Sequence, residues 1–284
     1  MILDINTQQP ERTIILTTNF TEGSRNACRY ALQLFGDEQV NYVLMHSYFE
    51  PLADHDGLYS ADQLMEQNSM KKLQDEKEKF RQEFTHLDLD EMECVSQYGV
   101  LVSAINDTIS QYEADYVVIG NKADFDLESR LLGYKTANFI RKIKGPVLAV
   151  PSHLKYTPVQ EVTFASDMKN IKDMHVLDPA LRLVKSSDAK LHILYVSNEE
   201  EVLVGQQAEA GLFLDNYFIE VPHEFHHSNN KFIMNGISSF VESSHSDLVI
   251  VLARKHNFFE RLLKHSQTQL LSELAKVPML VLHE

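Results

Sequence analysis

Three histidines and a glutamate stand close together in the segment Pro-His-Glu-Phe-His-His-Ser, residues 222–228. The imidazoles of His223, His226 and His227 and the carboxylate of Glu224 are ligand types that zinc accepts. Their spacing matches no strong zinc signature, and a loop from the third strand to the third helix of the second half explains them more simply. We therefore predict a loop there and no bound metal.

A second cluster carries positive charge, although the formal net charge of the chain is −15 at pH 7. It consists of Arg254, Lys255, His256, Arg261, Lys264 and His265. Such a segment could hold an anion by side-chain charge, and a solvated loop is the simpler interpretation. The acidic surface repels the phosphates of nucleic acids and anionic membranes, so we expect neither as a partner.

Signatures of common catalytic sites are missing from the sequence. It contains no Gly-x-Ser-x-Gly, no Gly-x4-Gly-Lys-[Ser/Thr] and no Gly-x-Gly-x2-Gly. Cys28 and Cys94 lie far apart, which fits free thiols in a reducing cytosol. The polar residues 1–12 do not resemble a signal peptide, and no apolar run reaches the roughly 18 residues of a membrane span. We expect a cytoplasmic protein that is not an enzyme.

The elements that must position these residues occur twice along the chain. Residues 14–20 resemble residues 162–168, and residues 42–47 resemble residues 192–197, at offsets of 148 and 150. Residues 115–120 and 144–150 resemble residues 247–252 and 276–282, both at an offset of 132. The common order indicates a duplicated domain with a deletion of about 18 residues after the second block of the second copy. We place the two domains at residues 1–151 and 158–284.

Each matched block is a short run rich in Val, Ile and Leu, which is typical of strands buried on both faces of a parallel sheet. Helical patterns separate the blocks. The predicted fold class is α/β, with two tandem doubly wound domains; one continuous sheet, or two unlike domains, would contradict this interpretation. Ligands of such sheets bind at the carboxyl ends of strands, which directs attention to Asn19, His46, Ser47 and the segment after Gly120.

The segment from Asp115 to Pro151 resembles the closing segment of the universal stress protein (UspA) family, a strand followed by Gly-x2-Gly-x9-Gly-[Ser/Thr], a helix and a final strand led by Pro. Residues 15–20 and 43–48 are similar to the first two strands of that family. The resemblance implies a five-stranded parallel sheet in each half, in the order 3-2-1-4-5. It also implies that the final edge strands pair inside the chain, as in a dimer of single domains, with a further homodimer left open.

The resemblance further implies a site for ATP or AMP, in which glycines let backbone amides approach the phosphates at a helix N-terminus. In the first half this site comprises Thr18, Asn19, His46, Ser47, Gly120, Lys122, Gly133, Tyr134 and Lys135. The match is incomplete, because Asn19 replaces an acid, Ala123 replaces the second glycine and Tyr134 replaces the Ser or Thr.

The second half departs further from the family pattern. Leu252, Lys255 and His265 replace all three glycines, although Asp167 retains the acid of the first strand. Bulky side chains at these positions keep the backbone away from a phosphate, so we expect at most one nucleotide per chain, in the first half.

Two function classes follow. The first is a non-enzymatic stress-response or signalling protein that binds an adenine nucleotide. The alternative is an interaction or scaffold protein of the same fold, with both nucleotide sites degenerate and a protein partner that the sequence does not identify. An ATP-hydrolysing enzyme is the weaker third class, because no residue is placed as a general base.

Overall fold

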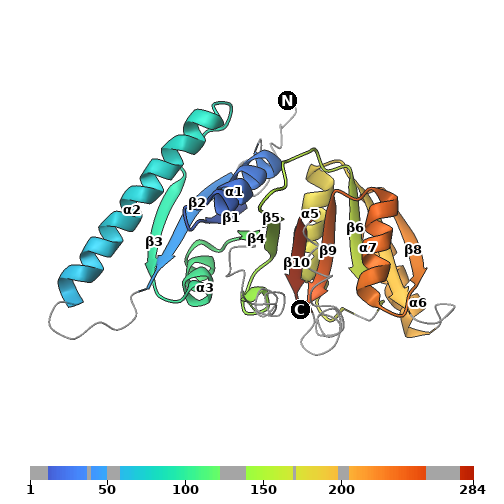
Figure 1. The fold of residues 1–284 in the computed structure, drawn as a ribbon. Coiled ribbons are helices and arrows are strands. Elements are labelled where there is room, and N and C mark those ends of the chain that lie inside the picture. The colour runs from blue at the N-terminus through green and yellow to red at the C-terminus, as the bar shows by residue number, and fades with distance from the viewer. Residues whose placement is uncertain are drawn as a thin grey trace, which may run out of the picture.

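The computed structural model describes residues 12–36, 40–49, 58–121, 139–168, 171–197, 205–253 and 276–284. Ten strands in these segments form one sheet in the order β3-β2-β1-β4-β5-β10-β9-β6-β7-β8. Figure 1 shows this sheet running across the molecule, with helices on both of its faces. Among the described helices, none is long and apolar enough to cross a bilayer.

The first half supplies five parallel strands in the order 3-2-1-4-5, as the family resemblance implies. They are β1 (Arg12–Thr17), β2 (Val40–Tyr48), β3 (Glu93–Tyr98), β4 (Tyr116–Asn121) and β5 (Val147–Pro151). The helices between them are α1 (Glu22–Phe35), α2 (Leu58–Glu83) and α3 (Leu101–Tyr112).

The second half repeats this arrangement with the same strand order. Its strands are β6 (Glu161–Ser166), β7 (Lys190–Ser197), β8 (His223–Asn229), β9 (Leu248–Ala253) and β10 (Met279–His283). Its helices are the 3-10 helix η1 (Met174–Leu177), α5 (Asp178–Ser186), α6 (Gln206–Tyr217) and α7 (Ile233–Ser244). The α/β class and the strand order are confirmed.

The two halves meet where β5 pairs with β10 in antiparallel fashion, with Leu148 opposite Leu280. This is the internal pairing of edge strands that the family resemblance implies. One part of the interpretation is nevertheless wrong, because these hydrogen bonds join both halves into a continuous sheet, which we had taken to exclude a duplicated fold. Each apolar edge satisfies its backbone groups on the other. The boundaries 1–151 and 158–284 stay a prediction.

Backbone conformation repeats with the sequence at two offsets. Phe20 (φ 63°) and Met168 (φ 47°), 148 residues apart, both adopt the left-handed region after the first strand of their half. Glu113 and His245, 132 residues apart, are both left-handed C-caps, of α3 and α7 respectively. The offsets of 148 and 132 are therefore confirmed, and they extend into the turns.

The offset of 150 for the second block is wrong by one residue. Ile14 pairs with Tyr42, and its counterpart Val162 pairs with Leu191, so Tyr42 corresponds to Leu191 and not to His192. Strands that are apolar on both faces look alike after a shift of one residue, whereas the shift moves every side chain to the other face. The offset for β2 and β7 is thus 149.

The missing residues of the second half lie between its second and third strands, inside the interval from the second to the fourth strand that the sequence predicts. The connection there contains α6 with 12 residues, whereas α2 in the first half has 26. The helices divide between the two faces of the sheet: α1, α2, α5 and α6 pack on one core, and α3 and α7 on the other. Each core runs through both halves, and the Tyr116 hydroxyl donates across the junction to the Pro179 carbonyl at 2.6 Å.

Candidate functional site

The strand order reverses between β1 and β4, which makes their carboxyl ends the expected position of a ligand. The residues after β1 are tied to both neighbours. The Thr18 amide donates to the Met45 carbonyl of β2 at 2.8 Å, and the Thr17 hydroxyl donates to the Val118 carbonyl of β4 at 2.8 Å. The structure therefore brings Thr18, His46 and Gly120 together at the carboxyl ends of β1, β2 and β4. We call this position the carboxyl edge of the first half.

The turn from β1 into α1 is held by its own polar side chains. The buried Thr18 hydroxyl accepts the Phe20 amide at 3.0 Å and lies 3.3 Å from the Ser24 hydroxyl. The side chain of Thr21, at the N-cap, caps no amide of α1. The positive end of the α1 dipole consequently faces this edge without a side-chain cap from Thr21.

Asn19 is exposed and folded back onto its own turn. Its Oδ1 accepts the Thr21 amide at 3.2 Å and the Thr21 hydroxyl at 2.6 Å. The side chain that replaces the acid of the family pattern is therefore engaged locally. Ser47 follows His46 on β2, in register with Gln97, so strand alternation turns its side chain to the other face. The structure does not group Ser47 with His46.

His46 is held by residues of α2. Its Nδ1 lies 2.8 Å from the Ser69 hydroxyl, and its ring packs on the ring of Phe20 with centroids 4.5 Å apart. The Lys72 ammonium lies 5.5 Å from the centroid of Phe20. Burial, and to a smaller extent the charge of Lys72, lowers the pKa of His46 to about 4. The imidazole is therefore neutral at pH 7.

Three residues of this arrangement are absent from the sequence prediction: Phe20, Ser69 and Lys72. Phe20 follows Asn19 directly, and its place after the strand end was the one available signal. Ser69 and Lys72 belong to a long helix in which nothing distinguishes them from other polar residues.

Gly120 lies near the end of β4, against the first turn of α1. A Cβ there would lie 2.9 Å from the Gly23 carbonyl oxygen and 3.1 Å from Ser24 Cα, so no side chain fits without a shift of backbone. Gly120 is therefore required by packing, whether or not a phosphate binds beside it. The predicted site residues Lys122, Gly133, Tyr134 and Lys135 lie outside the described residues.

The corresponding edge of the second half keeps the turn and changes the glycine. Met168 donates its amide to the Ser166 hydroxyl at 3.1 Å, as Phe20 does to Thr18. Leu252, which corresponds to Gly120, is a buried leucine. The basic segment 254–265 lies outside the described residues.

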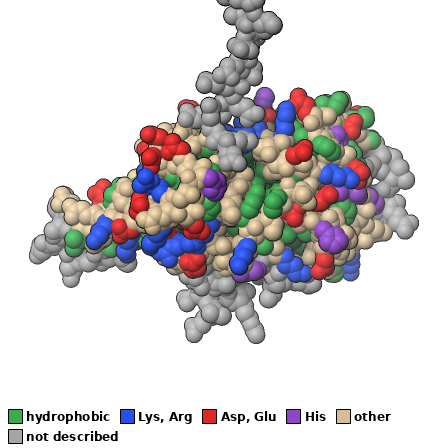
Figure 2. Space-filling model, turned by 90° about the horizontal axis from the view of Figure 1, so that it is seen from above, with side chains coloured by type: hydrophobic (Ala, Val, Ile, Leu, Met, Phe, Trp, Pro, Cys, Tyr) green, Lys and Arg blue, Asp and Glu red, His purple; other side chains and the backbone are tan. Residues whose placement is uncertain are grey.

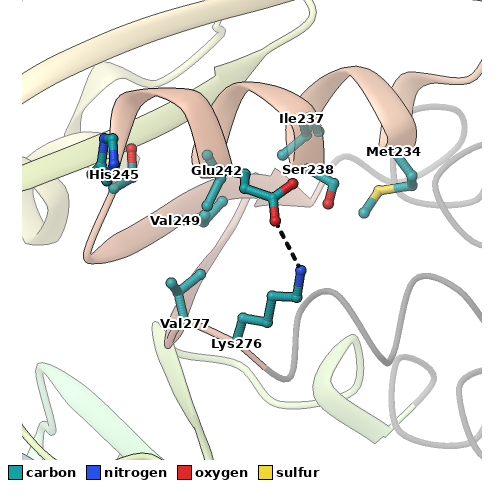
Figure 3. A pocket seen from close by; sticks show the side chains of 10 residues that line it. Met234, Ile237, Ser238, Glu242, His245, Val249, Lys276 and Val277 are labelled. Atoms are coloured by element: carbon teal, nitrogen blue, oxygen red, sulfur yellow. Dashed lines mark hydrogen bonds and ion pairs between the residues drawn. The ribbon is translucent and has the colours of Figure 1, made fainter.

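A cavity of about 230 Å³ lies elsewhere, between α7, β9 and the start of β10. Figure 3 shows Ile237, Val249 and Val277 on its walls and the Lys276–Glu242 ion pair, 3.3 Å long, beside it. It contains none of the predicted site residues.

The histidine-rich segment is a strand and not the predicted loop. Residues 223–229 form β8, which pairs in parallel with β7 from Leu191 to Ser197. Pairing with a buried neighbouring strand outweighs the polar composition of the segment. Alternation then separates its histidines: His227 lies 2.8 Å from the Ser197 hydroxyl, while His226 points to the opposite face.

Comparison with known proteins agrees with the fold. The model of the universal stress protein family matches residues 11–151. A universal stress protein from Archaeoglobus fulgidus is 15% identical, with a TM-score of 0.69, over 96% of this chain and 99% of that chain. A proposed universal stress protein from Pseudomonas aeruginosa is 13% identical, with a TM-score of 0.55, over 98% and 95%.

A universal stress protein in complex with cAMP is 22% identical and covers 49% of this chain and 96% of its own, with a TM-score of 0.38. At their identities, the structures from Archaeoglobus fulgidus and Pseudomonas aeruginosa show a shared fold. Among curated proteins, none matches this chain significantly.

Proposed function

Because the chain belongs to the universal stress protein family, through residues 11–151, we propose that it is a non-enzymatic stress-response or signalling protein that binds ATP or AMP in its first half. One observation carries the proposal. Thr18, His46 and Gly120 come together at the reversal of strand order, beside the N-terminus of α1. Strand ends of this kind suit a nucleotide, since backbone amides at a helix N-terminus favour phosphate.

The side chains at this edge support binding rather than acid–base chemistry. The described ends of β1, β2 and β4 carry hydroxyls, the amide of Asn19 and an imidazole whose pKa lies well below 7. The phenyl ring of Phe20 packs at a tilt on the ring of His46, and an aromatic face of this kind is one that a purine base can contact. We place the protein in the cytoplasm, which fits the free thiols of Cys28 and Cys94.

Calorimetric titration of the full chain with ATP and with AMP tests the proposal. We expect saturable binding that Gly133→Val abolishes, because a branched side chain there would stand against the phosphates. His265→Val, at the corresponding position 132 residues later, is the matched control and should leave binding unchanged. Unchanged ATP affinity in Gly133→Val would remove this site.

A second candidate function, an interaction or scaffold protein, is favoured by apolar side chains on and after α6. Leu212, Phe213 and Ile219 are 64%, 59% and 73% exposed. Clusters of this kind mark protein contacts more often than random surface does. Mass spectrometry of the protein as purified separates the two functions, since a co-purified adenine nucleotide supports the first and its absence, with no titratable binding, supports the second.

A further inference from the structure

We propose that the second half binds one zinc ion between β7 and β8, through His192, Glu224 and His226. One ligand atom from each residue lies within 4.8 Å of the other two. Figure 2 shows several histidine side chains at the right, the end of the molecule that β7 and β8 form in Figure 1. The site is independent of the proposed nucleotide function.

The register of the strands explains why these residues meet. His192 of β7 lies directly beside Glu224 of β8, and Leu194 lies beside His226. Neighbours in register point to the same face, as do residues two apart on one strand. His192, Glu224 and His226 therefore share the face that α7 covers, although more than 30 residues separate His192 from the other two.

The distances are close to those of a zinc site. Nδ1 of His192 lies 2.9 Å from Nε2 of His226, and Nε2 of His226 lies 3.7 Å from a carboxylate oxygen of Glu224. Ligand bonds of about 2.0–2.1 Å at tetrahedral angles separate ligand atoms by about 3.3 Å. The side chains of His226 and Glu224 are 29% and 54% exposed, so we expect rotation of these two side chains to bring the three atoms to that spacing when zinc binds.

Glu161 of β6 fixes which nitrogen of His192 faces the ion. Nε2 of His192 lies 2.6 Å from the Glu161 carboxylate, and because a carboxylate accepts, Nε2 carries the proton. Nδ1 then presents its lone pair toward His226. A carboxylate behind a buried histidine is the outer partner that orients metal-binding imidazoles in proteins.

The surroundings leave one coordination position open. Phe240 of α7 packs on His192 and on His226, with ring centroids 5.8 Å and 4.7 Å away, and closes the inner side. The side chain of Glu224 is 54% exposed on the edge strand β8. Three protein ligands with a water in the fourth position are the arrangement that zinc adopts where its site reaches solvent. Two imidazoles favour zinc over Mg²⁺ and Ca²⁺, which prefer oxygen.

Lys190 is the local competitor. Its ammonium binds one oxygen of Glu224 at 2.7 Å, while the other oxygen is the one near His226. The site also lies away from the nucleotide edge, since His192 and Glu161 stand near the amino ends of their strands. In the first half the corresponding residues are Val43, Glu93 and Val95, which cannot form it.

The test is a zinc titration of the full chain, freed of metal by a chelator and followed by competition with a chromophoric chelator. We expect one zinc per chain, visible absorption bands of tetrahedral Co²⁺ on substitution, and no effect of Mg²⁺. His226→Ala should weaken binding by more than about 100-fold, the upper limit for loss of an outer partner, and Glu161→Gln by about 10- to 100-fold.

His227→Ala is the matched control, because His227 lies on the same strand and points to the other face. It should bind zinc as the parent does. Zinc should raise the unfolding midpoint of the parent and of His227→Ala and leave that of His226→Ala unchanged. Equal affinity and stoichiometry in the parent and His226→Ala, or equal losses in both variants, would overturn the proposal.

Discussion

The two halves share a framework and differ at the ends of their strands. Asp115 accepts the Thr13 amide at 3.1 Å in the first half, and Asp247 accepts the Glu161 amide at 3.0 Å in the second. These carboxylates hold the start of the first strand to the fourth in both copies. A contact that the fold itself requires has therefore been kept twice.

The residues that could contact a ligand differ between the two halves. At the carboxyl ends, Gly120 corresponds to Leu252 and His46 to Tyr195. The chain after the first strand differs too, because α1 begins at Glu22, whereas the described residues 171–173 of the second half are not helical. The comparison teaches that the framework contacts of the two halves agree, whereas these side chains at the carboxyl ends of the strands differ.

The largest expected effect is in nucleotide stoichiometry. The second half lacks the three glycines, and each lost backbone donor to a charged oxygen costs about 1.5–3 kcal/mol. Two lost contacts weaken a micromolar site to about millimolar or beyond, so calorimetry of the full chain should give one ATP or AMP per chain. Two micromolar sites would show that the basic segment 254–265 replaces the glycines, and the contrast between the halves would fail.

The next effect concerns the close packing of Gly120. Gly120→Ala places a Cβ 2.9 Å from the Gly23 carbonyl oxygen and should lower the free energy of unfolding by about 1–3 kcal/mol. Gly211→Ala in α6, where nothing lies within 4 Å of the added Cβ, is the control and should stabilise slightly. Denaturant unfolding measures both. If Gly120→Ala were as stable as the parent, the first turn of α1 would tolerate a side chain at position 120, as the second half tolerates Leu252.

A smaller effect should appear in acid. The unfolded chain protonates His46 near pH 6.5, while burial keeps the pKa of the folded residue at about 4. The unfolded state therefore binds the proton first, and stability falls as the pH is lowered from 6.5 to 4.

His46→Gln should reduce that loss by about 1–2 kcal/mol, after a discount for partial exposure of the ring. Unfolding midpoints measured across this range check it, with the exposed His153→Gln as the control for removal of a histidine. If the unfolding midpoint of His46→Gln depended on pH between 6.5 and 4 as it does in the parent, His46 would not be the source of the loss.

The smallest expected effect is on zinc affinity at the amino ends of the strands in the second half. Lys190→Met frees the Glu224 oxygen that the ammonium now holds, and should tighten zinc binding by about two- to five-fold, the range of an exposed ion pair. Chelator competition measures the change. The control Lys185→Met removes an exposed lysine that pairs with Glu220 instead. Weaker zinc binding in Lys190→Met would indicate that the lysine positions Glu224 for the metal.

The resemblance to the universal stress protein family implied the strand order and the internal edge pairing. The repeated blocks located the deletion, because buried parallel strands leave strong apolar signals in the sequence. The sequence comparison misaligned β2 with its counterpart β7 by one residue, since Tyr42 and its neighbours are apolar on both faces. His192 was missed for a related reason. A histidine inside an apolar strand gives no sign of facing Glu224 and His226 until the strands are aligned.

The proposed nucleotide site was predicted less completely. Thr18, His46 and Gly120 entered the prediction because topology directs attention to strand ends. Ser69 and Lys72 contact His46 and Phe20 from a helix whose rotation the sequence does not specify. Ser47 was included by adjacency, and alternation along β2 places it on the other face.

The antiparallel pairing of β5 with β10 has a consequence for the molecularity of unfolding. When two separate chains pair their edge strands, dissociation accompanies unfolding, and the midpoint rises with protein concentration. Here both strands belong to one polypeptide, and the Asp115–Arg182 ion pair, 2.8 Å long, spans the same junction. Separation of β5 from β10 is therefore a first-order event, and dilution alone does not cause it. The two halves remain together at any concentration at which the chain is folded.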